Sequence, residues 1–233
     1  MKKALGILGG MGPQATVDFL QKIINLTEAA VDSEHIRIYL DNHSQVPDRT
    51  AAILGGGLSC LPALQESIHK LEGCGAGVIA MPCVTAHYFS PGIQEVVTGQ
   101  FIDILEVIVQ VCRERFPDQC AGVLTSVGTA ESQLMTNRLR SAEINHITLE
   151  PADQLELGRL ILQVKGKQVA ATIPRFQALV NEMRKRGADY FILGCTELPL
   201  IAGAYDFPYP SIDVTEELAR AAILACGYAL KNN

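Results

Sequence analysis

The feature that most constrains this chain is an internal repeat that ends twice in a cysteine. The segments GAGVIAMPC, from Gly75, and GADYFILGC, from Gly187, both begin Gly-Ala and reach a cysteine after six further residues. Those cysteines, Cys83 and Cys195, are 112 residues apart. Two other pairs of segments, LGILGGMGP with AGVLTSVGT and FID with SID, repeat at nearly the same offset. The repeat therefore predicts two copies of one structural half.

Each half alternates short apolar runs with helical patterns, which predicts α/β lobes built on parallel sheets. We expect an N-terminal lobe of residues 1–104 plus 211–233 and a C-terminal lobe of residues 105–210, because the last strand and helix match the segment after the first cysteine. In such sheets ligands bind beyond the carboxyl ends of the strands, where both cysteines fall. We therefore expect the active site in a cleft between the lobes, with the two thiols facing each other.

Composition limits the possible partners and the compartment. The 233 residues are 48% hydrophobic with a net charge of −6, and Lys and Arg are scattered, so no nucleic-acid partner is expected. No run approaches the roughly 18 apolar residues that span a bilayer, and the N-terminus enters a glycine-rich turn, which predicts a cytoplasmic protein without a membrane partner. Seven cysteines, an odd number, are expected to be mostly reduced, and no Cys/His spacing marks a metal site.

Two further segments offer groups for an anionic ligand. The turn after Leu8, Gly-Gly-Met-Gly-Pro, leads into a helical pattern, where backbone N–H groups suit a carboxylate better than a nucleotide. The polar loop QVPDRT contains Arg49, whose guanidinium is a planar fork for a carboxylate. A surface ion pair between Arg49 and Asp48 is the alternative for that side chain.

The placement of Cys83 and Cys195 predicts acid/base chemistry. A cysteine between a strand and a helix lies near the positive end of the helix dipole, which is expected to lower its pKa. Thr85 and Thr196 follow closely and could donate hydrogen bonds to the sulfur or to a substrate carboxylate. Two thiols on opposite faces of one pocket suit racemisation, since one base removes a proton and an acid returns it to the other face. The sequence has no clear pyridoxal-phosphate signature, so a dry pocket with fixed donors would stabilise the carbanion.

Four segments together, MPCVTAH, LGCTELP, LGILGGMGPQAT and QVPDRT, resemble the aspartate/glutamate racemase family of cofactor-independent amino-acid racemases, most closely its aspartate racemase branch. The resemblance covers essentially the whole chain. It implies two flavodoxin-like lobes related by a pseudo-twofold axis, a homodimer, no cofactor, and Cys83 and Cys195 as the residues that interconvert L- and D-aspartate or another acidic amino acid. Arg49 and Lys165 would face carboxylates. With Thr196 added from its place beside Cys195, the expected substrate-binding residues are Met11, Asp48, Arg49, Thr50, Val84, Thr85, Ala86, Lys165 and Thr196.

One departure from the family leaves the substrate open. The family motif normally has Asn after the first cysteine, where this chain has Val84, so a polar contact to the substrate is lost. A related diacid isomerase or decarboxylase with a nucleophilic cysteine is therefore an alternative, as is a non-catalytic protein that binds a dicarboxylate or an amino acid. His87 is either a proton partner or a helix-side histidine with satisfied hydrogen bonds. Glu197 is either part of the site or a carboxylate at a helix start.

Overall fold

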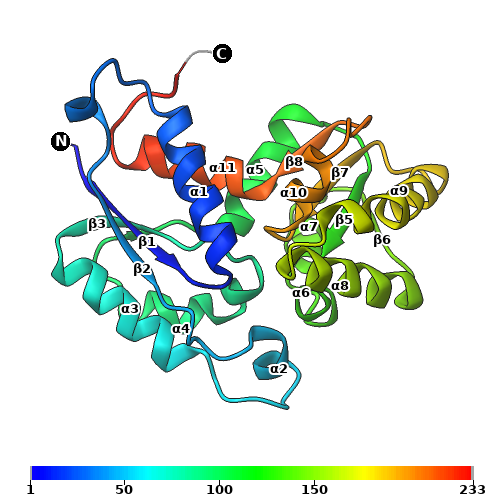
Figure 1. The fold of residues 1–233 in the computed structure, drawn as a ribbon, viewed down its shortest axis with the longest axis horizontal. Coiled ribbons are helices and arrows are strands. Elements are labelled where there is room, and N and C mark those ends of the chain that lie inside the picture. Colours follow the sequence, from blue (N-terminus) through cyan, green and yellow to red (C-terminus); the bar gives the residue numbers. More distant parts are fainter. Residues whose placement is uncertain (1, 232–233) are drawn as a thin grey trace. The chain divides into compact units, whose positions relative to one another are not determined.

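The computed structural model describes residues 2–231, which form two compact units. The first unit contains the chain up to Val107 and from Thr215 onward, and the second runs from Ile108 to Val214. The chain leaves the first unit within helix α5 (Ile104–Arg115) and returns at the start of helix α11 (Val214–Ala225) (Figure 1).

The first unit is built on a four-stranded parallel sheet in the order β2-β1-β3-β4. Its central strand β1 is buried over five of six positions, as expected when helices cover both faces of a sheet. The strands are β1 (Ala4–Gly9), β2 (Ile38–Asn42), β3 (Ala76–Ala80) and β4 (Gln100–Phe101). The helices are α1 (Pro13–Leu26), the 3-10 helix η1 (Asp32–Glu34), α2 (Arg49–Ile53), α3 (Leu61–Gly73), the 3-10 helix η2 (Thr85–Phe89) and α4 (Ser90–Gln94), followed by α5 and, from the end of the chain, α11.

The second unit repeats this plan in a parallel sheet of order β6-β5-β7-β8. All residues of β5 and of β7 are buried. The strands are β5 (Ala121–Thr125), β6 (His146–Thr148), β7 (Tyr190–Gly194) and β8 (Ser211–Asp213). The helices are α6 (Val127–Glu131), α7 (Leu134–Ser141), α8 (Pro151–Lys165), α9 (Val169–Lys185) and α10 (Leu198–Gly203).

The common strand order confirms the two copies and the flavodoxin-like α/β fold that the repeat predicts. A local detail is repeated as well. Gly75, before β3, has φ +99°, and Gly187, before β7, has φ +103°, so both halves turn into their third strand through a left-handed residue that favours glycine.

Helices cover both faces of the first sheet. α3 packs on β1 and β3, and Figure 1 shows α1 and α11 on the other side of this sheet. α11 is tied to α1 by a hydrogen bond from Lys22 Nζ to Thr215 Oγ1 of 2.7 Å. The segment after α11 is tied to the segment after α1 by a bridge between Thr27 and Leu230.

Local features set the ends of several elements. The helix after the glycine turn, α1, ends at Leu26, because Thr27 turns into that bridge. The polar loop before residue 50 ends in a short helix, α2, that the sequence pattern does not predict. In the second unit, α6 and α7 are separate helices because Gln133, with φ of +53°, interrupts the helical path between them.

The unit boundaries also differ slightly from the expected ranges. The sequence predicts residues 211–214 in the first lobe with the rest of the C-terminal segment. They lie instead in the second unit, because β8 pairs with β7 in its sheet.

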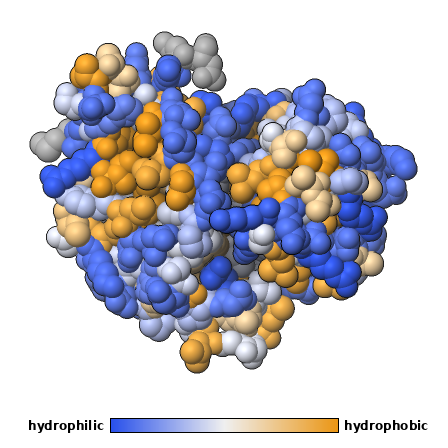
Figure 2. Space-filling model, in the orientation of Figure 1, coloured by the Kyte–Doolittle hydropathy of each residue, from blue (hydrophilic) through white to orange (hydrophobic). Residues whose placement is uncertain are grey.

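The surface of the first unit has an apolar area on α1. Val17 is 57% exposed and Ile24 is 43% exposed, and Figure 2 shows hydrophobic surface over this part of the unit. Among residues 2–231, no helix combines the length and the apolar character that crossing a membrane requires.

Candidate active site

Cys83 lies just past the carboxyl end of β3, in the core of the first unit. Its side chain is buried and packs in a cluster with Met11, which follows β1, and with Ala86 of η2. Its backbone N–H donates to Met81 O (2.8 Å). Val84 and Thr85, which come next, are also buried. The expected residues Met11, Cys83 and Ala86 are therefore brought together within one unit.

A second thiol, Cys60, lies beside this site, and no motif in the sequence points to it. Its Sγ–H donates to Pro47 O at 3.2 Å, which fixes it against the loop that leads to Arg49. Burial raises the pKa of Cys60, the Arg49 charge lowers it, and Cys83 and then Asp48 raise it. Cys60 thus lies within electrostatic reach of all three expected site residues.

The loop itself orients two expected binding residues. Asp48 Oδ1 accepts a hydrogen bond from Ala51 N (2.8 Å) and caps α2. Arg49 donates through Nη1 to Val46 O (3.3 Å) and Pro47 O (3.1 Å). The Asp48 carboxylate therefore caps the N-terminus of α2, and the Arg49 guanidinium is oriented by two backbone carbonyls. Thr50 is half-buried in the first turn of α2.

His87 is a buried histidine with both ring nitrogens engaged. Nδ1 lies 2.9 Å from Cys83 O, so it is the nitrogen that donates, and Nε2 accepts from Ile104 N (3.3 Å). These contacts confirm the interpretation of a helix-side histidine with satisfied hydrogen bonds. They also fix the turn that presents Cys83.

Cys195 directly follows β7 in the second unit and contacts a carboxylate. Its Sγ–H donates to Glu197 Oε2 at 3.0 Å, and Thr196 Oγ1 donates to the same oxygen at 3.0 Å. Lys165 Nζ lies 3.9 Å from the other oxygen, Oε1. The structure thus brings the expected residues Cys195, Thr196 and Lys165 together around Glu197.

The sequence leaves two roles open for Glu197, and the interpretation that its side chain caps the following helix is wrong. It precedes α10 as the N-cap residue, but its side chain makes no capping hydrogen bond. The carboxylate instead turns back to the thiol and the hydroxyl. The sequence signal for a site role was the position of Glu197 two residues after Cys195.

The expected lowering of the thiol pKa is wrong for Cys195. Burial raises the pKa of this thiol well above its usual value, and the charge and hydrogen bond of Glu197 raise it further. The Lys165 charge opposes them. The following helix, α10, has only six residues and begins after Glu197, and the carboxylate of that residue contacts the sulfur directly at 3.0 Å.

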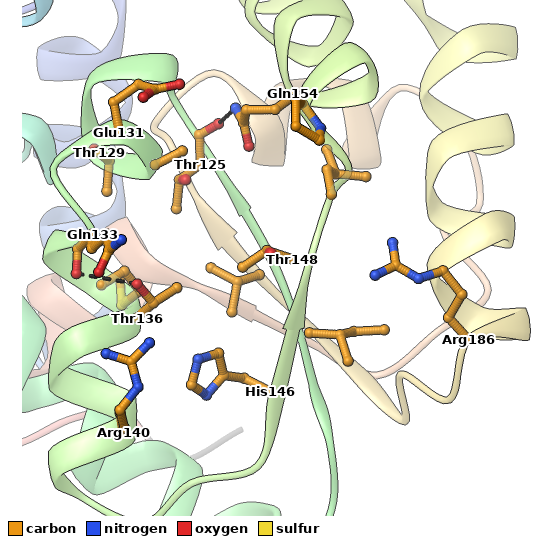
Figure 3. Close-up of a pocket in the computed structure, with 16 residues that line it drawn as sticks. Thr125, Thr129, Glu131, Gln133, Thr136, Arg140, His146, Thr148, Gln154 and Arg186 are labelled. Atoms are coloured by element: carbon orange, nitrogen blue, oxygen red, sulfur yellow. Dashed lines mark hydrogen bonds between the residues drawn. The ribbon is translucent and has the colours of Figure 1, made fainter.

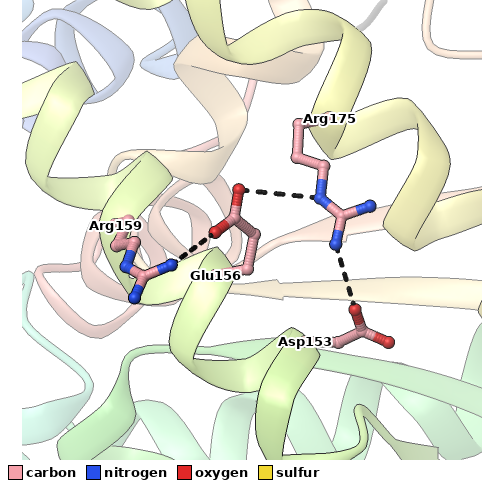
Figure 4. Close-up of polar contacts among 4 residues, drawn as sticks. All are labelled: Asp153, Glu156, Arg159 and Arg175. Carbon is pink, nitrogen blue, oxygen red and sulfur yellow. Dashed lines mark hydrogen bonds and ion pairs between the residues drawn. The ribbon is translucent and has the colours of Figure 1, made fainter.

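Lys165 is the last residue of α8, where its charge suits the negative end of the helix dipole. α8 is positioned mainly by packing its buried residues against α9. Ion pairs add to this: Arg175 of α9 pairs with Asp153 (3.3 Å) and Glu156 (3.6 Å) of α8, and Arg159 pairs with Glu156 (3.1 Å) (Figure 4). Exposed pairs of this kind contribute little individually, so the apolar contacts fix the end of α8.

A pocket of about 490 Å³ lies elsewhere in the second unit, beside the edge strand β6 and α7 (Figure 3). Its cations already have partners, since Arg140 donates to Asn137 Oδ1 (2.7 Å) and Arg186 pairs with Glu150 (3.2 Å). Neither Cys195 nor Glu197 lines it. We therefore keep it separate from the thiol site.

The two α/β units share one strand order, and in each a buried or half-buried cysteine follows the third strand. The Asp/Glu/Hydantoin racemase family model matches residues 8–222. The chain belongs to this family.

Individual relatives agree with that assignment. The Picrophilus torridus aspartate racemase structure is 30% identical, with a TM-score of 0.89, over 98% of this chain and 96% of that one. The broad specificity amino-acid racemase RacX of Bacillus subtilis (strain 168) is 26% identical over 94% of this chain and 96% of its own length. An aspartate racemase homologue from Pyrococcus horikoshii OT3, 20% identical with a TM-score of 0.74 over 97% of this chain and 99% of that one, shares the fold.

Proposed function

We propose that this protein is a cofactor-independent racemase that interconverts the L and D forms of an acidic amino acid, with aspartate as the first candidate. One observation carries the proposal: in two sheets of the same strand order, a cysteine follows the third strand, Cys83 after β3 in one unit and Cys195 after β7 in the other. The name of the Picrophilus torridus relative supports aspartate as the substrate.

In the proposed reaction, the two thiols act on opposite faces of the substrate Cα. One thiolate takes the Cα proton and becomes a thiol, and the electron pair of the broken C–H bond remains on the planar carbanion. The other thiol then gives its proton to the opposite face and becomes a thiolate. The substrate leaves with inverted configuration, and the two sulfurs have exchanged protonation states.

The carbanion needs fixed positive charge and hydrogen-bond donors in a site without bulk water. We propose that Arg49 and Lys165 bind the two carboxylates. Within residues 2–231, Arg49 donates its hydrogen bonds to Val46 O and Pro47 O through Nη1. The edge of the guanidinium formed by Nε and Nη2 can then bind a carboxylate through two parallel hydrogen bonds. Met11, Asp48, Thr50, Val84, Thr85, Ala86 and Thr196 complete the proposed substrate-binding residues.

Incubation with each enantiomer of aspartate and of glutamate in deuterated water tests this function. Loss of optical activity together with deuterium at Cα is expected for at least one of these acids. A new product would instead favour isomerase or decarboxylase chemistry. Stabilisation of the protein by the ligand without exchange would favour a binding protein, and either result contradicts the proposed racemase.

Val84 offers a separate prediction about substrate preference. Its buried side chain provides no hydrogen bond where the family motif has Asn. Val84→Asn is expected to raise kcat/KM for aspartate by roughly 2- to 12-fold, the value of one net hydrogen bond of about 0.5–1.5 kcal/mol. Val84→Leu, an apolar control of similar size, is expected to give no gain. Equal activities of the two variants in a coupled D-aspartate assay would contradict this role.

We propose further that the protein is a cytoplasmic homodimer. All seven cysteines lie among the described residues and are free thiols, the state that a reducing compartment maintains. The exposed Val17 and Ile24 of α1 are apolar surface that a second copy would cover. Light scattering is expected to give twice the mass of one chain, and Val17→Lys is expected to lower it. A monomeric wild-type protein would contradict the dimer.

A further inference from the structure

Glu197 is a buried carboxylate whose hydrogen bonds are directed at the thiol site. Its side chain is 7% exposed, and one oxygen, Oε2, accepts from both Cys195 Sγ and Thr196 Oγ1 at 3.0 Å. The other oxygen, Oε1, lies 3.9 Å from Lys165 Nζ. At this distance the two charges interact, but the groups do not form a close hydrogen bond. The carboxylate is therefore held in one orientation with its best acceptor position on the sulfur.

We infer that Glu197 is a positioning residue that keeps Cys195 in its thiol form in the substrate-free protein. The inference rests on the proposed racemase for its meaning in catalysis, but the protonation state itself is a property of the free protein. A thiol can donate to the carboxylate, whereas a thiolate in the same place would be an anion 3.0 Å from another anion. The geometry therefore favours the protonated sulfur.

The surrounding charges agree in sign with this assignment. Burial disfavours the thiolate most, and Glu197 disfavours it next through its charge and its side-chain hydrogen bond. The Lys165 charge and a hydrogen bond from the Glu197 backbone favour the thiolate, but the pKa of Cys195 is raised overall. Thr196, the remaining polar neighbour, donates to Glu197 and keeps it in place. Within the second unit, the charges that act on this sulfur thus come from the strand end and from the end of α8.

This assignment gives the two thiols different starting roles. Cys195 begins as the acid, and the base of the first half-reaction is left to Cys83. A substrate carboxylate that binds Lys165 would weaken the larger of the two influences that favour the Cys195 thiolate. Substrate binding would then hold Cys195 more firmly in its protonated form until the carbanion takes the proton.

The test is the pH dependence of alkylation of Cys195 in the intact protein without substrate. Iodoacetamide labelling is followed for each cysteine by peptide mass spectrometry, and the pH of half-maximal rate is read for Cys195. Glu197→Gln retains an oxygen acceptor but removes the charge, so that pH is expected to fall. A fall of one unit corresponds to an about tenfold higher rate at a fixed pH below about 8.5, where ordinary thiols titrate. Lys165→Met removes the favouring charge, and the pH is expected to rise.

The expected shifts of the pH midpoint have opposite signs in Glu197→Gln and Lys165→Met, which distinguishes an electrostatic effect from a general loss of packing around Cys195. A substitution that merely admitted water would reduce the effect of burial and lower the midpoint in both variants. Glu182→Gln, which removes an exposed carboxylate of α9 that pairs with Lys185, is the matched control and is expected to leave the Cys195 profile unchanged.

No change in Glu197→Gln, or a fall in both variants, would overturn the inference. The racemase assay of the wild-type protein is a separate measurement. If racemisation is absent while the two midpoints move in opposite directions, the proposed function fails and the thiol assignment stands. If racemisation is present and the midpoints do not move as expected, the reverse holds.

Discussion

Cys83→Ser is expected to lower the rate of racemisation by about 10²–10⁴-fold, the range that a positioned acid or base contributes. The serine hydroxyl has nearly the shape of the thiol but is a far weaker acid, so one face of the substrate loses its proton donor and acceptor. Cys195 remains, and deuterium exchange at Cα is expected to persist for one enantiomer only. Cys195→Ser is expected to show the same loss with exchange on the other enantiomer.

Cys74→Ser is the matched control, since this cysteine is exposed in the same unit and is expected to leave the rate unchanged. Optical rotation gives the rate of interconversion, and proton NMR of the substrate gives the exchange on each enantiomer. Racemisation at the wild-type rate in either cysteine variant would exclude two-base chemistry. Exchange of both enantiomers in one variant would indicate that a single base reaches both faces.

The topology was predictable because the repeat and the buried strands are local signals. β3 and β7 are short apolar runs preceded by a Gly-Ala pair, and each ends at its cysteine, so both could be located from the sequence. Parallel pairing then leaves few arrangements for four strands joined by helices. The sheet to which β8 belongs was harder to predict, because its pairing with β7 depends on contacts between distant segments and not on the sequence of β8 itself.

The residues grouped around Glu197 could be located from the sequence, but their electrostatics only partly. The sequence pointed to Cys195, Thr196 and Lys165, but the pKa of Cys195 depends first on how deeply the thiol is buried and then on where the Glu197 side chain points. A carboxylate at a helix start can cap the helix or turn away, and both choices have the same sequence. Burial is the largest cause of the raised pKa of Cys195, and the rotamer of Glu197 adds to it.

Cys60 shows a second limit of the same kind. It precedes Cys83 by many residues and has no motif, so its position beside Arg49 depends on the path of the loop between β2 and α3. That loop contains α2, whose five residues are too few to show a helical period. Side chains that meet only through such a loop are not predictable from sequence patterns alone.

Gly10→Ala is expected to destabilise the first unit and to disturb the proposed site with it. Gly10 has φ +91°, a conformation that side chains rarely adopt, and an added Cβ would lie 2.3 Å from His43 C and 2.6 Å from Ser44 N. The backbone conformation alone costs about 1–3 kcal/mol. Because the contacted atoms are backbone, the segment after β2 must also shift. Urea unfolding is expected to give a lower midpoint, and KM is expected to rise because Arg49 follows that segment.

Gly73→Ala separates this effect from the general cost of replacing a glycine. Gly73 is the last residue of α3, and nothing lies within 4 Å of its added Cβ. Alanine favours a helix over glycine by about 1 kcal/mol, so this control is expected to be neutral or slightly more stable. Equal midpoints for Gly10→Ala and the wild type would mean that the turn after β1 yields without cost. The close approach of residues 10 and 43 would then have no part in holding Met11 and the Arg49 loop near Cys83.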